Sequence, residues 1–435
     1  MEPHRIVVIG GGLAGWGVAQ RLRSYARHGD ASLTLVEERP CHEFPPLYYE
    51  VATGVRNGSV EEAADLAGGV CVDFRRLAHR TRQTGITVVR DRAAGVDRAS
   101  RTVALRGGKI IPYDALVLAL GSETAYYGIR GLRDHAVPLK SAGDALRIRK
   151  RICDLVERAS RGSIERFHVV VGGGGATGVE FAAELATTCR SLVRRGLLRH
   201  DDIEIALVEG MSRLLVAFPE DASRMALQRL HRLGVRVLLD AFIKDASMDQ
   251  VTVVPRPLRE GEMRARLLCG FEGETCTLPA DLTVWTGGIA PPPLARDAGF
   301  SVDRGGRVVV DRTGLVEGER CVFALGDCAA FPDRKGNPLP PLASHAVRQA
   351  PVVAENVMAA LEGANRRDYR ARTMPAILPI GGKCVLLAYR NRVTIGMHVW
   401  CFRSLVDLQY FTTAFGWMTG TAIWLRGLRA YMQND

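Results

Sequence analysis

The sequence has no C-x-x-C pair among its ten cysteines, and no stretch of about 20 uninterrupted apolar residues that would form a transmembrane helix. Its N-terminus has neither the basic region nor the apolar run of a secretory leader. These absences argue against a secreted, disulfide-rich protein and against a membrane-spanning one. They predict a reduced, cytoplasmic protein, and we assign no set of residues to a metal ion.

Charge of one sign is in excess. The chain carries 58 Lys and Arg against 47 Asp and Glu, a net charge of +11. Its 435 residues are enough for two or three domains, and the 47% that are apolar can form a sizeable core. Positive charge favours anionic partners such as nucleotides, acidic lipid headgroups or nucleic acid. The basic residues are scattered, so a solvated basic surface is the alternative. We find no nucleic-acid-binding module and expect no nucleic-acid partner.

The strongest motif is a strand, a glycine turn, a helix and a second strand over residues 5–37. The turn has the spacing G-x-G-x-x-G at Gly10, Gly12 and Gly15. Glycines there allow a tight turn and let backbone N–H groups and the helix N-terminus approach a pyrophosphate. Glu37 ends the second strand, where a carboxylate can accept hydrogen bonds from a ribose diol. The combination predicts a dinucleotide-binding unit.

The same motif occurs again after residue 166. A strand over 167–171 precedes Gly173, Gly175 and Gly178, and a strand over 203–208 ends at Glu209. An acid at that position favours the unphosphorylated ribose of NADH over NADPH. Arg213 lies close enough in the sequence to leave the 2′-phosphate of NADPH as an alternative. The chain therefore has two predicted dinucleotide sites.

Three further strands end in glycine, which is where an open α/β sheet receives its ligands. Gly121 follows one strand, Gly288 another, and Gly326 with Asp327 a third. Asp327 could bind the ribityl hydroxyls of a flavin, and an ordinary Gly-Asp turn is the alternative. Runs at 86–89 and 102–105 predict strands of a small β-layer.

Two regions supply candidate reactive side chains. Glu180 follows the second glycine motif, where it either complements the helix dipole or faces a nicotinamide. A helix is predicted over 344–361, kinked or divided at Pro351, and it places His345 and Gln349 on one face.

The tail, 394–431, is rich in Trp, Tyr and Phe and has an apolar stripe at helical spacing. Aromatic and arginine residues at the ends of such a stripe suit a membrane interface, while docking on the protein's own core or on a dimer partner is the alternative. The stripe consists of Leu405, Leu408, Phe411, Phe415, Met418, Ala422 and Leu425.

Together these motifs resemble type II NADH:quinone oxidoreductases, which are flavoproteins with two dinucleotide-binding domains. Phe44-Pro-Pro-Leu-Tyr-Tyr-Glu-Val-Ala-Thr-Gly54 is similar to that family's F-x-P-L-L-Y-x-V-A-x-G. Further matches lie at 171–180, 284–291 and 324–327, so the resemblance covers residues 5 to about 360. The family's A-Q-x-A-x-Q segment at the quinone pocket is Ser344-His-Ala-Val-Arg-Gln349 here, and the tail does not closely match the family's membrane anchor.

The resemblance implies an α/β fold of two Rossmann-like domains. The FAD domain, 1–121 and 288–358, is split by an NADH domain, 122–287, and followed by a membrane-interface or dimerisation segment, 359–435. FAD is expected on Gly10, Gly12, Gly15, Glu37, Gly121 and Asp327. NADH is expected on Gly173, Gly175, Gly178, Glu209 and Gly288, with Glu180 at the nicotinamide.

The implied activity is electron transfer from NADH through FAD to a membrane quinone, without proton pumping. The cofactor carries the chemistry and the protein positions it. Glu180, His345 and Gln349 are expected to tune binding or quinone protonation. We expect a peripheral protein on the cytoplasmic side of the inner membrane, with contacts to the anionic membrane surface and a possible homodimer.

Three rival functions remain. A sulfide:quinone oxidoreductase shares the architecture but needs cysteines beside the flavin, and Cys153, Cys328 and Cys384 form no convincing pair. An NADH-binding flavoprotein that changes partners would turn over very slowly. Flavin disulfide reductases carry two cysteines, five apart, where this chain has Cys41 alone. Cys41 has no such partner, which disfavours dithiol chemistry at the flavin.

Overall fold

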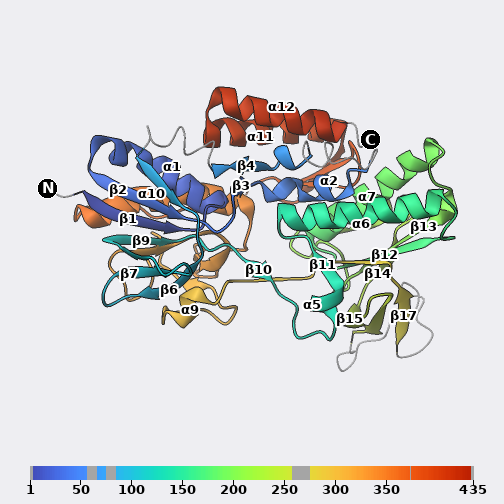
Figure 1. Cartoon of the computed structure of the whole chain (residues 1–435), viewed down its shortest axis with the longest axis horizontal. Helices are drawn as coiled ribbons and strands as arrows, with labels where there is room; N and C mark the ends of the chain where they lie inside the picture. Colours follow the sequence, from blue (N-terminus) through green and yellow to red (C-terminus); the bar gives the residue numbers. More distant parts are fainter. Residues whose placement is uncertain (1–2, 56–65, 75–84, 257–274, 373, 433–435) are drawn as a thin grey trace. The chain divides into compact units, whose positions relative to one another are not determined.

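The computed structural model describes residues 3–55, 66–74, 85–256, 275–372 and 374–432, without the side chains of 429–432 (Figure 1). The chain forms two compact units. Unit 1 comprises 1–44, 71–123 and 289–372, and unit 2 comprises 45–70, 124–288 and 373–435.

Unit 1 is built on a five-stranded parallel sheet of order β21-β9-β1-β2-β5. Its strands are apolar, as expected for strands buried on both faces. Their bounds are β1 (His4–Ile9), β2 (Ala31–Val36), β5 (Ile86–Val89), β9 (Ala115–Leu118) and β21 (Val322–Ala324). The run at 86–89 thus belongs to this main sheet and not to the small β-layer that we expected.

Two helices of unit 1 pack closely because one residue has no side chain. A Cβ added at Gly17 of α1 (Leu13–His28) would lie 2.8 Å from the Cβ of Ala350 in α10 (Ala343–Leu361). Gly17 lowers the helix propensity of α1, but it allows this contact. Pro351 lies inside α10, which continues to Leu361.

The remaining elements of unit 1 are short. The sheet β6-β7-β8 is antiparallel, as is the pair β3-β4. Their bounds are β3 (Cys41–Glu43), β4 (Cys71–Asp73), β6 (Ala93–Asp97), β7 (Thr102–Leu105), β8 (Ile110–Pro112), β10 (Glu123–Thr124), β19 (Ile289–Ala290), α9 (Leu294–Asp297), β20 (Val308–Val309), η3 (Gly326–Cys328) and β22 (Ala329–Ala330).

Unit 2 repeats the architecture with a second five-stranded parallel sheet, of order β11-β18-β12-β13-β14. The bounds are β11 (Ala136–Pro138), β12 (Phe167–Gly172), β13 (Ile203–Val208), β14 (Arg236–Leu238) and β18 (Leu282–Trp285). Its helices are η1 (Pro45–Leu47), α2 (Tyr48–Thr53), α5 (Leu132–His135), α6 (Ala142–Ser160), α7 (Ala176–Arg194), η2 (His200–Asp202) and α8 (Glu220–Arg232).

Unit 2 also contains two antiparallel three-stranded sheets and the two helices of the tail. One contains β15 (Ala241–Ala246), β16 (Gln250–Pro255) and β17 (Cys276–Pro279), and the other β23 (Ala376–Pro379), β24 (Val385–Tyr389) and β25 (Arg392–Gly396). A strand that the sequence predicts over 264–271 lies outside the described residues.

The tail forms two helices where the stripe suggested one continuous apolar face. In Figure 1, α11 (Met397–Phe415) and α12 (Trp417–Met432) lie side by side, separated by Gly416 at φ +82°. Their close approach requires Gly420, because a Cβ there would lie 2.4 Å from the backbone of Phe411. The indole Nε1 of Trp424 donates to the carbonyl oxygen of Ser404 at 2.9 Å.

The break divides the predicted stripe. Phe411 and Phe415 are buried, whereas Leu405, Met418 and Leu425 are exposed. Within the residues that the structure describes, no helix combines the length and the apolar character that a membrane span needs.

Candidate functional site

The first glycine turn has the geometry of a pyrophosphate cradle. A Cβ at Gly15 would lie 1.9 Å from the carbonyl oxygen of Gly10, whereas a Cβ at Gly12 would meet nothing within 4 Å. Gly10 itself has φ +100°. No described side chain caps α1 at Gly12, so the N–H groups of its first turn have no side-chain partner there and can bind an anion. This turn fits an anionic group such as the pyrophosphate of FAD.

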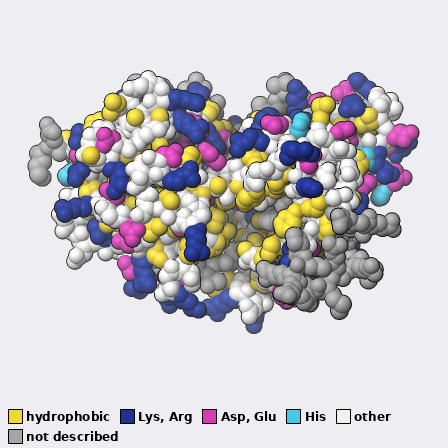
Figure 2. Space-filling view, turned by 90° about the horizontal axis from the view of Figure 1, so that it is seen from below, with side chains coloured by type: hydrophobic (Ala, Val, Ile, Leu, Met, Phe, Trp, Pro, Cys, Tyr) yellow, Lys and Arg dark blue, Asp and Glu magenta, His cyan; other side chains and the backbone are white. Residues whose placement is uncertain are grey.

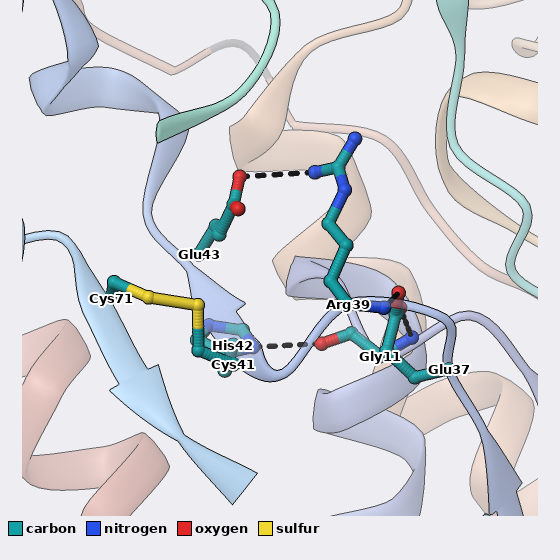
Figure 3. Close-up of a disulfide and its surroundings, with 7 residues drawn as sticks. All are labelled: Gly11, Glu37, Arg39, Cys41, His42, Glu43 and Cys71. Carbon is teal, nitrogen blue, oxygen red and sulfur yellow. Dashed lines mark hydrogen bonds and ion pairs between the residues drawn. A yellow bond between two sulfur atoms is a disulfide. The ribbon is translucent and has the colours of Figure 1, made fainter. Parts of the chain in front are cut away.

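The acid at the end of β2 holds the turn in place (Figure 3). One carboxylate oxygen of Glu37 accepts from the Gly11 N–H at 2.6 Å, and the other accepts from the Arg39 N–H at 2.9 Å. Arg39 also forms an ion pair with Glu43 at 3.0 Å. The carboxylate is therefore fixed beside the turn, where a ribose diol would meet it.

A second set of unit 1 residues gathers at the carboxyl end of β21. The Ser122 hydroxyl donates to Asp327 Oδ2 at 2.7 Å, next to Gly121, which has φ +66°. Gln349 is only 2% exposed, and its Oε1 accepts from the Gly326 N–H at 2.9 Å. The structure thus brings Gly121, Asp327 and Gln349 together at one sheet edge.

His345 has a different neighbour. Its Nδ1 lies 3.1 Å from the hydroxyl oxygen of Tyr369, and the two rings meet edge to face. Burial, and then the positive charge of Arg348, lowers the pKa of His345. The Tyr369 contact could not be foreseen, because no motif marks that tyrosine.

The second glycine turn, in unit 2, repeats the geometry of the first. A Cβ at Gly178 would lie 1.9 Å from the Gly173 carbonyl oxygen, and a Cβ at Gly175 would meet nothing within 4 Å. Glu209 accepts from the Gly174 N–H at 2.5 Å and from the Met211 N–H at 2.8 Å. The turn and its acid fit a second dinucleotide.

Aromatic rings cover the turn after β18. A Cβ at Gly288 would lie 2.1 Å from the hydroxyl oxygen of Tyr127, which is 68% exposed. Tyr127 has φ +52°, an uncommon conformation for a bulky residue. Trp285 packs against Gly287 and donates from Nε1 to the Ala125 carbonyl oxygen at 2.8 Å. Any bulkier residue at Gly288 would displace the Tyr127 ring.

Glu180 belongs to a buried charged cluster. Arg403 of α11 lies 3.8 Å from a Glu50 carboxylate oxygen and 3.9 Å from one of Asp407. Its guanidinium lies 5.5 Å from the centre of the Tyr49 ring, and the Tyr49 hydroxyl donates to Glu50 at 3.0 Å. A pocket borders this cluster, and its lining includes Leu47, Glu50, Trp400, Arg403, Ser404, Asp407, Phe411, Trp424 and Leu428.

Burial dominates the acid–base properties of the cluster. It raises the pKa of Glu180 to about 8, against the opposing charge of Arg403 and with a contribution from Glu50. It also raises the pKa of Asp407 to about 6. Glu180 is therefore largely protonated at neutral pH. No motif in the sequence indicates that Arg403 belongs to its surroundings.

Cys41 does have a partner, although not the one five residues away that flavin disulfide reductases carry. Cys41 forms a disulfide with Cys71, 30 residues later, across the pair β3-β4 (Figure 3). The search for a second cysteine five residues away could not find it, because the partner comes from another strand. The disulfide also conflicts with the expectation of a fully reduced chain.

Two glycine turns, each with an acid after the second strand and each in its own parallel-sheet unit, define a protein with two dinucleotide-binding folds. The sequence signature of one family, "Pyridine nucleotide-disulphide oxidoreductase", matches residues 4–350. The chain belongs to this family.

Individual relatives agree with this assignment. The chain is 27% identical to a type II NADH:quinone oxidoreductase of Haemophilus influenzae, over 89% of this chain and 87% of the relative. It is 26% identical to demethylphylloquinone reductase NdbB of Synechocystis, over 99% of this chain and 98% of the relative. The fold is similar to NDH2 from Plasmodium falciparum in complex with NADH, with a TM-score of 0.80, 17% identity and 98% of each chain covered.

Replacing Asp327 with alanine should weaken FAD binding by roughly ten- to a hundredfold, because hydrogen bonds to a charged group contribute about 1.5–3 kcal/mol. The dissociation constant can be measured by flavin fluorescence. Asp297→Ala, at an exposed position of α9 in the same unit, is the control. Full flavin content in the Asp327 variant would remove Asp327 from the FAD site.

Replacing Glu180 with glutamine should change how stability depends on pH. Since the folded state raises the pKa of Glu180, its contribution is fully present at low pH and is lost as pH rises towards 8. Glutamine cannot ionise, so the variant should gain stability relative to wild type between about pH 4.5 and 8, by roughly 2–5 kcal/mol.

Thermal unfolding across this pH range measures the difference. Glu157→Gln, at an exposed position of α6, is the matched control for the substitution itself. If stability depends on pH in the same way in wild type and in Glu180→Gln, the pKa of Glu180 is not raised.

Proposed function

We propose that the chain is an FAD-dependent oxidoreductase that transfers electrons from NADH to a membrane quinone, without pumping protons. The observation that carries this proposal is the pair of dinucleotide sites. The turn at Gly10–Gly15, with Glu37 and Asp327, suits a flavin dinucleotide, and the turn at Gly173–Gly178, with Glu209, suits NADH. The relative in Haemophilus influenzae is named for this reaction.

Bound FAD would supply the redox chemistry, accepting a hydride from NADH and passing two electrons to the quinone. The protein's own residues bind and orient these groups. Glu37 and Glu209 hold the two glycine turns, and Asp327 offers a carboxylate at the mouth of the unit 1 sheet. Glu180 holds a proton at neutral pH within unit 2.

NADH is favoured over NADPH. Glu209 would repel a 2′-phosphate and accept a hydrogen bond from an unmodified ribose diol. Arg213 donates instead to the carbonyl oxygens of Leu215, Val216 and Phe218, at 2.8–3.3 Å. Its guanidinium is thus held by its own loop, which argues against a role in binding a phosphate.

The choice between NADH and NADPH tests the role of Glu209, and the flavin spectrum tests the proposed reaction. Wild type should have a lower KM for NADH than for NADPH, and Glu209→Gln should reduce this preference by about tenfold, since it removes a charge but keeps a hydrogen-bond acceptor. The visible spectrum after NADH, and then after a soluble quinone, should show flavin bleaching and recovery. A lower KM for NADPH in wild type would contradict this assignment.

The cysteines argue against the rival function, in which the enzyme oxidises sulfide. Sulfide oxidation needs reactive thiols, but burial raises the pKa of Cys328 to about 12. Its thiol donates to the carbonyl oxygens of Leu118 and Leu325. In this proposal Gln349 and His345 line the quinone site, and His345 relays a proton.

Replacing His345 with glutamine separates the two half-reactions. Flavin reduction by NADH should be unchanged, while reoxidation by quinone should slow by about a hundredfold, the lower end of general acid catalysis. Wild-type reoxidation should accelerate as pH falls through the lowered pKa of His345, and the variant should lose this dependence.

Stopped-flow measurements at several pH values provide the test. His231→Gln, at an exposed position of α8, is the control. Identical reoxidation profiles for wild type and His345→Gln would leave His345 with only a packing role beside Tyr369.

In this proposal the protein lies on the cytoplasmic side of the inner membrane, and its tail supports the peripheral position. Large apolar side chains are exposed on α11 and α12, among them Trp417 at 72% and Met418 at 79%. The net charge of +11 would attract anionic lipids. Figure 2 shows the face turned away from these helices, where Lys and Arg lie among acidic and apolar side chains and form no single basic patch.

The double substitution Trp417→Ser and Met418→Ser should weaken binding to anionic vesicles by about tenfold or more, because burying each side chain is worth roughly 1.5–3 kcal/mol. Binding of wild type should also fall as salt rises. Sedimentation with vesicles measures both effects. Unchanged vesicle binding, together with loss of a wild-type dimer, would assign the exposed residues to a homodimer interface instead.

A further inference from the structure

The disulfide Cys41–Cys71 joins two short paired strands, β3 and β4, beside the first glycine turn. β3 and β4 have three residues each, with His42 opposite Val72. A two-stranded pair is marginally stable on its own, and shorter pairs are weaker still. The covalent link between β3 and β4 is therefore a major part of what holds them together.

β3 reaches the glycine turn through His42 (Figure 3). His42, next to Cys41, places its Nδ1 2.8 Å from the Gly11 carbonyl oxygen. Burial lowers the pKa of His42 to about 4, so the ring is neutral and Nδ1 carries the hydrogen that the carbonyl accepts. Gly11 is thus held by His42 on its carbonyl and by Glu37 on its N–H.

Phe74, immediately after β4, reaches Gly11 from the other strand. A Cβ added at Gly11 would lie 2.7 Å from the tip of the Phe74 ring. The Phe74 N–H donates to the Pro40 carbonyl oxygen at 3.0 Å, and its ring meets Trp16 of α1 edge to face at 5.8 Å. His42 of β3 and Phe74, which follows β4, therefore both lie against the glycine turn.

We propose that Cys41–Cys71 is a reversible thiol–disulfide modification site that sets how tightly the Gly10–Gly15 turn holds its dinucleotide. This inference rests on the proposed FAD site. In a protein on the cytoplasmic side of the membrane, a disulfide is normally transient or redox-sensing and not a permanent brace. The oxidised form fixes His42 and Phe74 against Gly11, and reduction releases them.

The exposure of the two cysteines determines which sulfur a reductant attacks. Cys41 is 5% exposed, whereas Cys71 is partly exposed, so an incoming thiolate reaches Cys71. A dithiol reductant attacks Cys71 Sγ, the S–S bond breaks, and Cys41 leaves as a thiolate that takes up a proton. The second thiol of the reductant then releases Cys71 as a thiol. Two electrons pass to the protein, and the reductant becomes a cyclic disulfide.

The experiment compares FAD retention by oxidised and reduced holoenzyme. Purified protein is treated with a dithiol or left untreated, alkylated, and mapped by mass spectrometry. The rate of FAD release is followed by flavin fluorescence, which does not depend on turnover. We expect reduction to speed release by about tenfold, and Cys41→Ser/Cys71→Ser to release FAD at the fast rate with or without the dithiol.

Cys401→Ser is the matched control, because Cys401 is exposed and outside the disulfide, and this variant should respond like wild type. Equal release by oxidised and reduced wild type would overturn the inference, as would alkylation of Cys41 and Cys71 in untreated protein. If the double variant does not fold, the wild-type comparison still decides. Absence of FAD from the oxidised protein would instead refute the proposed function.

Discussion

The hydrogen bond from a glycine N–H to the acid that ends the next strand is the interaction on which both dinucleotide turns depend. In unit 1 it joins Gly11 to Glu37, and in unit 2 it joins Gly174 to Glu209. A charge-assisted bond of this kind is about twice as strong as a neutral one. It forms only if both parallel strands end at the same edge, so sheet register and turn geometry are set together.

The parts that could be predicted from the sequence are those whose chemistry is local. Each glycine turn lies directly after its strand, and the helices that follow are long enough to show their pattern. The Cys41–Cys71 disulfide, the Tyr369 hydroxyl beside His345 and the Arg403 cluster join residues far apart in the chain. Spacing along the sequence contains no signal for such contacts, and tertiary packing alone brings them together.

The two sets of predicted site residues differ in how they are stabilised. In unit 1, Asp327 and Gln349 are held by hydrogen bonds to Ser122 and Gly326, so their positions follow from the ends of the strands. In unit 2, Glu180 is surrounded by buried charges, and its protonation depends on how far Arg403 offsets the loss of water. Strand geometry therefore determines where the unit 1 side chains lie, and electrostatics determines the protonation state of the unit 2 side chain.

The tail contributes both to the exposed apolar surface and to the buried surroundings of Glu180. Its exposed apolar residues suit a membrane, but its buried face carries Arg403 to Tyr49, Glu50 and the surroundings of Glu180. Deleting 396–435 would remove Arg403 and leave Glu50 without this guanidinium, a change that is costly in a buried site. Loss of membrane binding and loss of activity in a truncated chain would then have separate causes. Substitutions on the exposed side of α11 and α12 distinguish them, because they leave the buried cluster intact.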